Sequence, residues 1–289
     1  ILDFPDLSVD GTFPLGGVVC TIFMLKLGLH PILATFLTFF VGLLAGTVTG
    51  LLHVKFKISK LLSGIIVMTA LLSVNLALTK LLTRNGYTTT IFAYRSENLT
   101  GIFDGKLTEL FGKGAKDYVI LAILLFIVIV LKLIVDWFLK TKLGYLLRAT
   151  GDNEILVISL GRDSGTYKIM GLALANGFVS VSGALYSQLF MQYDNTSGTG
   201  KVVLALASVI IGLAVFSGFK HIKNTTAVIF GAVIYSLCLN YLVLVDTDGI
   251  YLKLLNAVLF ALILIFNDKI SGFVARRSRR EGKTRTPHA

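Results

Sequence analysis

The residues that could carry out chemistry are few, and their spacing matches no catalytic or metal-binding pattern. The acidic clusters are Asp3 with Asp6 and Asp10, and Asp246 with Asp248, and neither has a base nearby. The sequence contains no P-loop, H-E-x-x-H, C-x-x-C or G-x-S-x-G motif, and its four histidines form no ligand cluster. We therefore expect no catalytic residue, no metal site and no cofactor bound by this chain.

A polar, basic stretch over residues 140–168 separates two strongly apolar runs. Within it, Asp152 and Asn153 can cap a short helix with Glu154 in its first turn, and Gly161 suits the helix end. A short capped helix on the basic side of a membrane protein is a docking surface for a soluble partner. The residues that we expect to form it are Gly151, Asp152, Asn153, Glu154, Ile155, Leu156 and Gly161.

The composition excludes a water-soluble fold. Of the 289 residues 55% are hydrophobic and only 15% are charged, against about 25% in soluble domains. We predict an all-α, polytopic membrane helix bundle of about eight spans. One span, at 201–219, is short enough to be broken or re-entrant. The apolar runs are 14–30, 32–52, 61–82, 118–139, 169–190, 201–219, 225–245 and 252–266.

Local features add three expectations to this plan. Pro14 suits the first turn of the first helix, because proline lacks the amide hydrogen that a later position would donate. Glycines 42, 46 and 50 share one helix face and predict close packing within the bundle, in preference to a specific dimer motif. Lys132 and Asp136 are one turn apart near the basic end of their span, so we expect them to snorkel or to pair locally in preference to a transport role.

The net charge of +11 indicates basic cytoplasmic loops rather than a nucleic-acid partner. Segments 53–60, 140–168, 220–223 and 267–289 together hold 17 of the 27 Lys and Arg residues, so we assign them to the cytoplasm. We expect a single transmembrane domain over 1–289, an extracytoplasmic loop at 83–117, a cytoplasmic coupling region at 140–168 and a basic cytoplasmic tail at 267–289. Because the chain begins at Ile1 without Met, we also expect residues before it.

The spans are nearly free of charged residues and therefore offer no proton relay or sodium site. Their polar residues are neutral, among them Asn75, Asn176 and Asn240. Hydrogen bonding between helices is the favoured role for each, and lining a solute pathway is the alternative. A transporter without its own ion coupling must take its energy from another protein.

Three stretches carry a resemblance to a known family. Asp6–Gly11 followed by Phe13–Gly16 resembles an N-terminal signature of ABC importer permeases of the ribose and branched-chain amino acid type. Arg148–Asn153 with Leu160 and Gly161 resembles their cytoplasmic coupling region, and Gly171–Leu185 resembles the glycine-rich helix after it. The subgroup with the greatest likeness is that of tryptophan/tyrosine-type transport permeases.

This resemblance implies a type II importer permease in a bacterial cell membrane. Its expected partners are a second copy of the chain, a cytoplasmic P-loop ATPase that binds ATP and magnesium, and an extracytoplasmic substrate-binding lipoprotein. The solute would be amino-acid-like, and an aromatic one fits the subgroup. The alternative is a self-sufficient secondary transporter or channel. The expected pathway residues are Asp6, Ser8, Asp10, Phe13, Asn75, Asn176 and Asn240.

Overall fold

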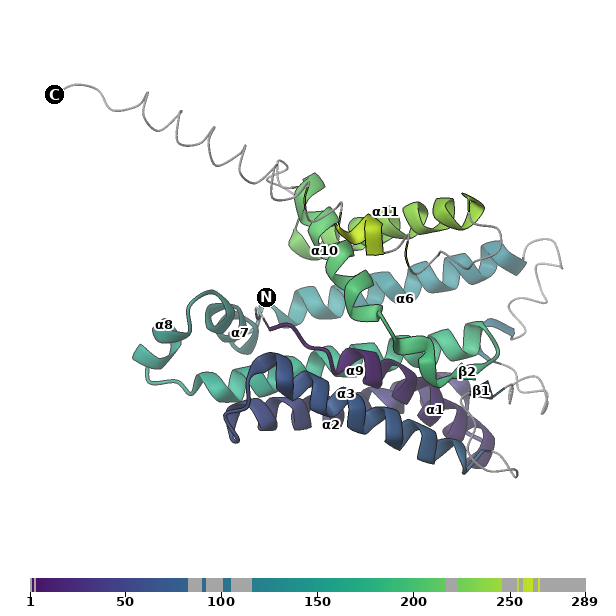
Figure 1. Cartoon of the computed structure of the whole chain (residues 1–289), viewed down its shortest axis with the longest axis horizontal. Helices are drawn as coiled ribbons and strands as arrows, with labels where there is room; N and C mark the ends of the chain where they lie inside the picture. Colours follow the sequence, from purple (N-terminus) through teal and green to yellow (C-terminus); the bar gives the residue numbers. More distant parts are fainter. Residues whose placement is uncertain are drawn as a thin grey trace, which may run out of the picture. The chain divides into compact units, whose positions relative to one another are not determined.

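In the part of the chain that the computed structural model describes, the fold is all-α apart from one two-stranded pairing (Figure 1). The structure describes residues 2, 4–82, 90–91, 101–104, 116–216, 223–245, 254, 257–261 and 265. Within these residues seven helices are long and apolar enough to cross a membrane, which confirms the predicted class. Most of the expected span 252–266, most of the expected loop 83–117 and the whole tail 267–289 lie outside the described residues.

The chain groups into two compact units, Ile1–Lys201 and Val202–Ala289. The elements of the first unit are α1 (Val9–Lys26), α2 (Pro31–Val54), α3 (Lys60–Thr79), β1 (Thr90–Ile91), η1 (Ile102–Asp104), α6 (Lys116–Phe138), α7 (Lys142–Asp152), α8 (Glu154–Ser159), α9 (Ser164–Leu189), β2 (Tyr193–Asp194) and η2 (Asn195–Gly198). Lys201 also begins α10 (Lys201–Phe216), which continues into the second unit and is followed there by α11 (Asn224–Val245).

The first unit is built around α9, against which α1 and α2 pack along much of their length (Figure 1). Gly42 and Gly46 of α2 face backbone atoms of Asn176 and Leu172, so that a side chain at either position would collide with α9. A Cβ at Gly50 would lie 2.8 Å from the Cα of Ile169. The prediction that this glycine face serves close packing within the bundle is therefore confirmed.

The expectation that the first helix starts at Pro14 is wrong. α1 begins at Val9, and Pro14 lies inside it. The residues before Pro14 are helical because they are buried: Gly11 packs on α3, and Thr12 and Phe13 are buried as well. Proline leaves the carbonyl of Asp10 without its helical donor. Gly198 of η2 approaches that carbonyl and the Pro14 ring so closely that no larger residue would fit.

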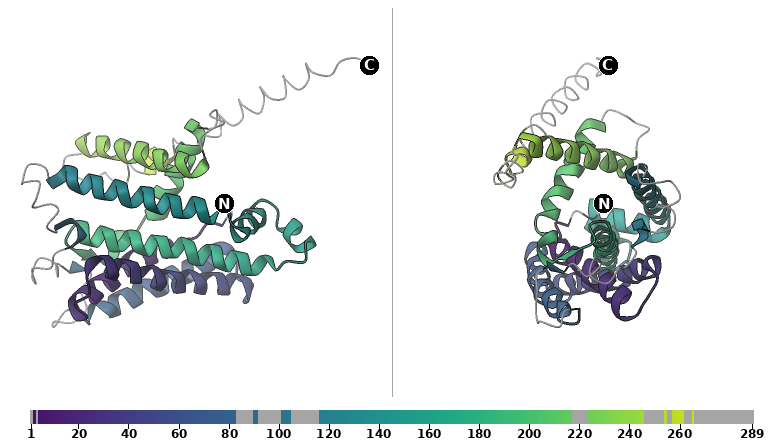
Figure 2. Two further views of the ribbon diagram at one scale, coloured as in Figure 1. Left: turned by 180° about the vertical axis from the view of Figure 1, so that it is seen from behind. Right: turned by 90° about the vertical axis from the view of Figure 1, so that its right-hand side faces the viewer.

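The two ends of the first unit differ in character (Figures 1 and 2). α7 and α8 extend from one end, beside the beginning of α9. At the other end β1 pairs with β2 in an antiparallel register, with Ile91 opposite Tyr193. Gln188 joins three elements there: its Nε2 donates to Thr35 Oγ1 at 2.7 Å, and its Oε1 accepts from the amide of Ile102 at 3.1 Å.

The second unit contains the contact between α10 and α11. Gly212 of α10 lies against the backbone of Ala227, and Gly231 of α11 lies against Ser208. Small residues at both crossing points allow the two helices to approach closely, as is usual between membrane helices. The run predicted at 201–219 thus begins as one continuous helix over Lys201–Phe216.

Candidate functional site

A buried polar layer occupies the middle of the first unit. Asn176, at the midpoint of α9, has no exposed surface, and its Oδ1 accepts from Thr12 Oγ1 at 2.7 Å and Ser8 Oγ at 3.2 Å. Its Nδ2 donates to Asp6 Oδ2 at 2.7 Å. Asp6 Oδ1 also accepts from the Ser8 amide at 2.9 Å, at the beginning of α1. Three predicted pathway residues, Asp6, Ser8 and Asn176, therefore meet in one network.

The segment before α1 brings Asp6 to this depth. Phe4 lies near the α2–α3 turn, where its ring is 5.2 Å from that of His53 and 5.9 Å from the Lys60 ammonium. Leu7 then packs against Gly64 of α3. α1 consequently begins level with the middle of α9, so that its amide-rich N-terminus and the Asp6 carboxylate lie inside the helix bundle. Interrupted helices at this depth are a common feature of transporter solute sites.

The other predicted pathway residues have different surroundings. Asn75 of α3 is fully buried; its Nδ2 donates to the Gly11 carbonyl at 3.0 Å, and its Oδ1 has no partner among the described residues. Asp10 and Phe13 lie on α1 but do not bond Asn176: Asp10 Oδ2 accepts from the Gly200 amide, next to η2, and the Phe13 ring lies against Tyr186 of α9. Asn240 lies on α11 in the second unit, and its side chain is exposed.

The predicted coupling region forms two helices, α7 and α8, at one end of the first unit. Asn153 ends α7 and caps α8, since its Oδ1 accepts from the Leu156 amide at 3.2 Å. Gly161 follows α8 with a φ of +70°, a conformation that favours glycine. The local prediction of a short capped helix ending at glycine is confirmed. Its role in coupling stays a prediction.

The surface of α8 is unusually apolar for a helix outside the membrane-spanning runs. Val157 is fully buried and anchors the helix. Ile155 and Ile158, one turn apart, are 78% and 56% exposed, and Leu156 and Leu160 are 50% and 63% exposed. Apolar side chains gathered in this way mark a surface that another molecule covers.

Glu154 connects this apolar surface to α9. Its Oε1 accepts from Lys168 Nζ at 2.6 Å and from Ser164 Oγ at 2.8 Å. The hydrogen bond from Lys168, supported by that from Ser164, lowers the pKa of Glu154 below its usual 4.5. Neither partner was predicted from the sequence, because the turn at Gly161 removes any helical spacing between Glu154 and these residues.

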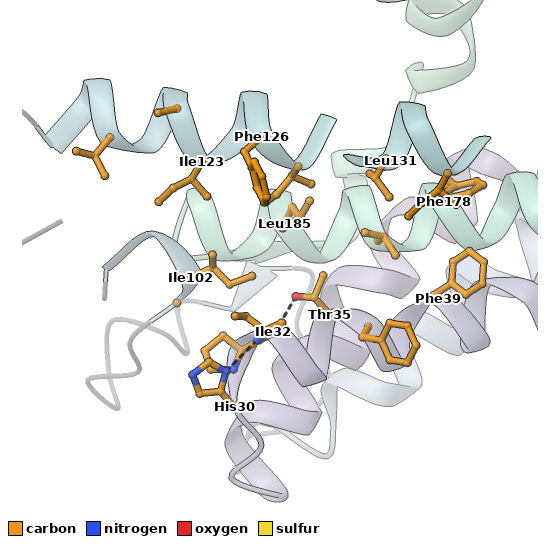
Figure 3. A pocket seen from close by; sticks show the side chains of 18 of the residues that line it. His30, Ile32, Thr35, Phe39, Ile102, Ile123, Phe126, Leu131, Phe178 and Leu185 are labelled. Atoms are coloured by element: carbon orange, nitrogen blue, oxygen red, sulfur yellow. Dashed lines mark hydrogen bonds between the residues drawn. The ribbon is translucent and has the colours of Figure 1, made fainter. Parts of the chain in front are cut away.

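A separate, apolar pocket of about 1320 Å³ lies between α6 and the α2–α9 pair (Figure 3). Its polar side chains are few, and two of them already make local hydrogen bonds: Thr35 Oγ1 donates to the Pro31 carbonyl, and His30 Nδ1 accepts from the Ile32 amide. Lys132 of α6 pairs with Asp136 at 3.3 Å, which is one of the two local arrangements predicted for them. The pocket thus suits apolar side chains or lipid acyl chains better than a charged solute.

Comparisons with known proteins identify a family and two relatives. Residues 1–267 match the family described as the branched-chain amino acid transport system permease component. The chain is 38% identical over 264 residues to a tyrosine transport system permease protein of Clostridioides difficile (strain R20291), covering 91% of this chain and 82% of the relative. It is also 28% identical over 267 residues to an uncharacterized protein of Rickettsia prowazekii (strain Madrid E), covering 90% and 87%.

The comparison with solved structures found no match. The family match covers all of the described residues, including the polar layer and both helices of the predicted coupling region. The chain therefore belongs to the family of branched-chain amino acid transport system permease components.

Proposed function

We propose that this chain is the membrane subunit of an ABC importer for an amino-acid-like solute, with an aromatic amino acid as the best candidate. The observation that carries the proposal is α8, a short helix with three exposed apolar residues, and a fourth, Leu160, directly after it. Glu154 joins this helix to the central helix α9. A separate P-loop ATPase, which binds ATP and magnesium, would dock on this surface. The tyrosine transport permease of C. difficile supports the choice of solute.

In this proposal ATP binding moves the partner ATPase, and the partner moves α8. The ion pair of Glu154 with Lys168 passes the displacement to the beginning of α9. Because α1 and α2 pack closely on α9, a shift of α9 changes the polar layer around Asn176 and opens the pathway toward the other face. Two copies of the chain would share one pathway, and an extracytoplasmic binding protein would deliver the solute.

The first test is a mild-detergent purification of the tagged chain from its native membrane. We expect a soluble P-loop ATPase and an extracytoplasmic binding protein to copurify with it. Uptake of labelled tyrosine into proteoliposomes should then require ATP and resist ionophores. A chain that purifies only with itself, and whose uptake collapses with an ionophore, would instead support a self-sufficient secondary transporter.

A further inference from the structure

A second group of polar and aromatic residues lies on α1, at the end of α9 and at the beginning of α10. The rings of Phe13 and Tyr186 pack edge to face, with 5.4 Å between their centres. The centre of the Phe190 ring lies 4.5 Å from that of Tyr186. The ammonium of Lys201 is 4.9 Å from the centre of the Phe13 ring and 5.0 Å from that of Tyr186. One cation therefore covers two rings of a three-ring cluster.

Asp10 fixes the position of this cation. Its Oδ2 accepts from the amide of Gly200 at 2.9 Å, and Gly200 has a φ of +82° that favours glycine. With Gly198 packed against the Asp10 carbonyl, the backbone before Lys201 is held on α1. Asp10 is also near enough to attract the Lys201 ammonium. Among the described residues the cluster thus contains one anion, one cation and three rings.

A lysine here needs an explanation beyond packing. Residues 195–216 form a candidate membrane span whose α-helix begins at Lys201, so this lysine lies near the end of the span that carries η2. Lys201 is only half-buried and Phe190 is 53% exposed, so a small molecule can reach both side chains. An apolar residue would attach α10 to the rings of Phe13 and Tyr186 without the cost of desolvating a charge.

We propose that Asp10, Phe13, Tyr186, Phe190 and Lys201 form a subsite for an α-amino acid with an aromatic side chain, an inference that rests on the proposed function. Lys201 binds the carboxylate of the solute, Asp10 attracts its α-ammonium group, and the three rings contact its aromatic side chain. A carboxylate has several acceptor positions, so Asp10 keeps its bond to Gly200 while it does so.

The electrostatics of this cluster suit a solute that must leave again. Asp10 and Lys201 together are neutral, as is the zwitterion, so that binding adds no net charge to the span. The rings attract the Lys201 ammonium only weakly, so the carboxylate of the solute can draw this ammonium away from them. Passage through a transporter requires such modest, reversible binding.

The test measures binding of tritiated L-tyrosine to the purified full-length chain in lipid nanodiscs. Leucine, which lacks the ring, and tyramine, which lacks the carboxylate, serve as competitors. The Lys201→Met variant should bind tyrosine at least about tenfold more weakly, which is the effect of one charge-assisted hydrogen bond, and should bind tyramine unchanged. Lys201→Arg should restore binding. Lys26→Met, which changes an exposed lysine at the far end of α1, is the matched control.

A second variant keeps the test decisive if Lys201→Met does not fold. Phe190→Leu alters an exposed ring and should reduce the preference for tyrosine over leucine while leucine binding is retained. The subsite is overturned if the wild-type protein, Lys201→Met and Phe190→Leu all bind tyrosine equally well. It is also overturned if Lys201→Met weakens the binding of tyrosine and of tyramine to the same extent. If the assembled transporter still takes up tyrosine with ATP, the proposed function survives that result. If ATP-driven uptake fails in the wild-type transporter, the proposed function itself is wrong.

Discussion

At the scale of single residues, Glu154 links the predicted coupling region to α9. It accepts hydrogen bonds from Lys168 and Ser164, and both donors belong to the first turns of α9. The Glu154 side chain is 44% exposed, so this ion pair contributes little to overall stability. In the proposed mechanism this ion pair transmits movement, because it joins the beginning of α8 to α9, the helix that holds Asn176.

We predict that Glu154→Gln lowers uptake about two- to fivefold, the effect of losing one exposed ion pair, while ATP hydrolysis continues. Lys168→Met should lower uptake to the same extent. The double variant, Glu154→Gln with Lys168→Met, should lower uptake no further than either single variant, because all three remove the same ion pair. Arg162→Met, which removes an exposed charge from the turn between α8 and α9, should be close to wild type. Solute taken up per ATP hydrolysed is the measurement.

The lowered pKa of Glu154 sets the pH dependence of this effect. A carboxyl group with a depressed pKa in the folded state contributes stability above its ordinary pKa of 4.5, and this contribution is lost as the pH falls through the depressed value. The ratio of wild-type to Glu154→Gln uptake should therefore be constant between about pH 5 and 8. A ratio that changes steeply within this range would contradict the assigned contacts.

At the scale of elements, α8 is the part of the described chain whose exposure most clearly calls for a partner. Ile155 and Ile158 lie one turn apart and project from the same side of a helix fixed by the buried Val157. Covering two such side chains is worth about 3–6 kcal/mol. We predict that the double variant Ile155→Ser with Ile158→Ser weakens association with the ATPase at least about a hundredfold.

Copurification and size-exclusion chromatography test this prediction together. The matched control is Leu27→Ser with Ile32→Ser, which changes two residues of similar exposure at the opposite end of the first unit. We expect the α8 variant to remain monodisperse and lose the ATPase, and the control to keep it. Retention of the ATPase by the α8 variant would mean that the docking surface lies elsewhere.

Much of this element plan is visible in the sequence. Membrane spans follow from long apolar runs, the α8 cap follows from Asn153 and Gly161, and the packing of α2 follows from its glycine spacing. The start of α1 could not be predicted, because burial against α3 and α9 overrides the preference of Pro14 for a first turn. The contacts of Lys201 with Phe13 and Tyr186 join distant parts of the chain that no local pattern connects.

At the scale of the whole molecule, the distribution of charge predicts its orientation. One end of the first unit carries α7 and α8. The basic loop 55–60 and the basic stretch 140–168 belong to this end. Among the described residues, the opposite end, with β1, β2 and η2, has fewer Lys and Arg residues. Membrane proteins retain their basic loops in the cytoplasm, so α8 should face the cytoplasmic ATPase, and η2 should face the side from which a binding protein delivers solute.

This orientation can be measured with single cysteines in a background where Cys20 and Cys238 are replaced by serine. Lys140→Cys lies in the turn before α7, and Thr199→Cys follows η2; both positions are exposed. In intact spheroplasts a membrane-impermeant maleimide should label Thr199→Cys and should label Lys140→Cys only after permeabilisation. The reverse pattern would place α8 outside, where no cytoplasmic ATPase could reach it, and would contradict the importer mechanism as a whole.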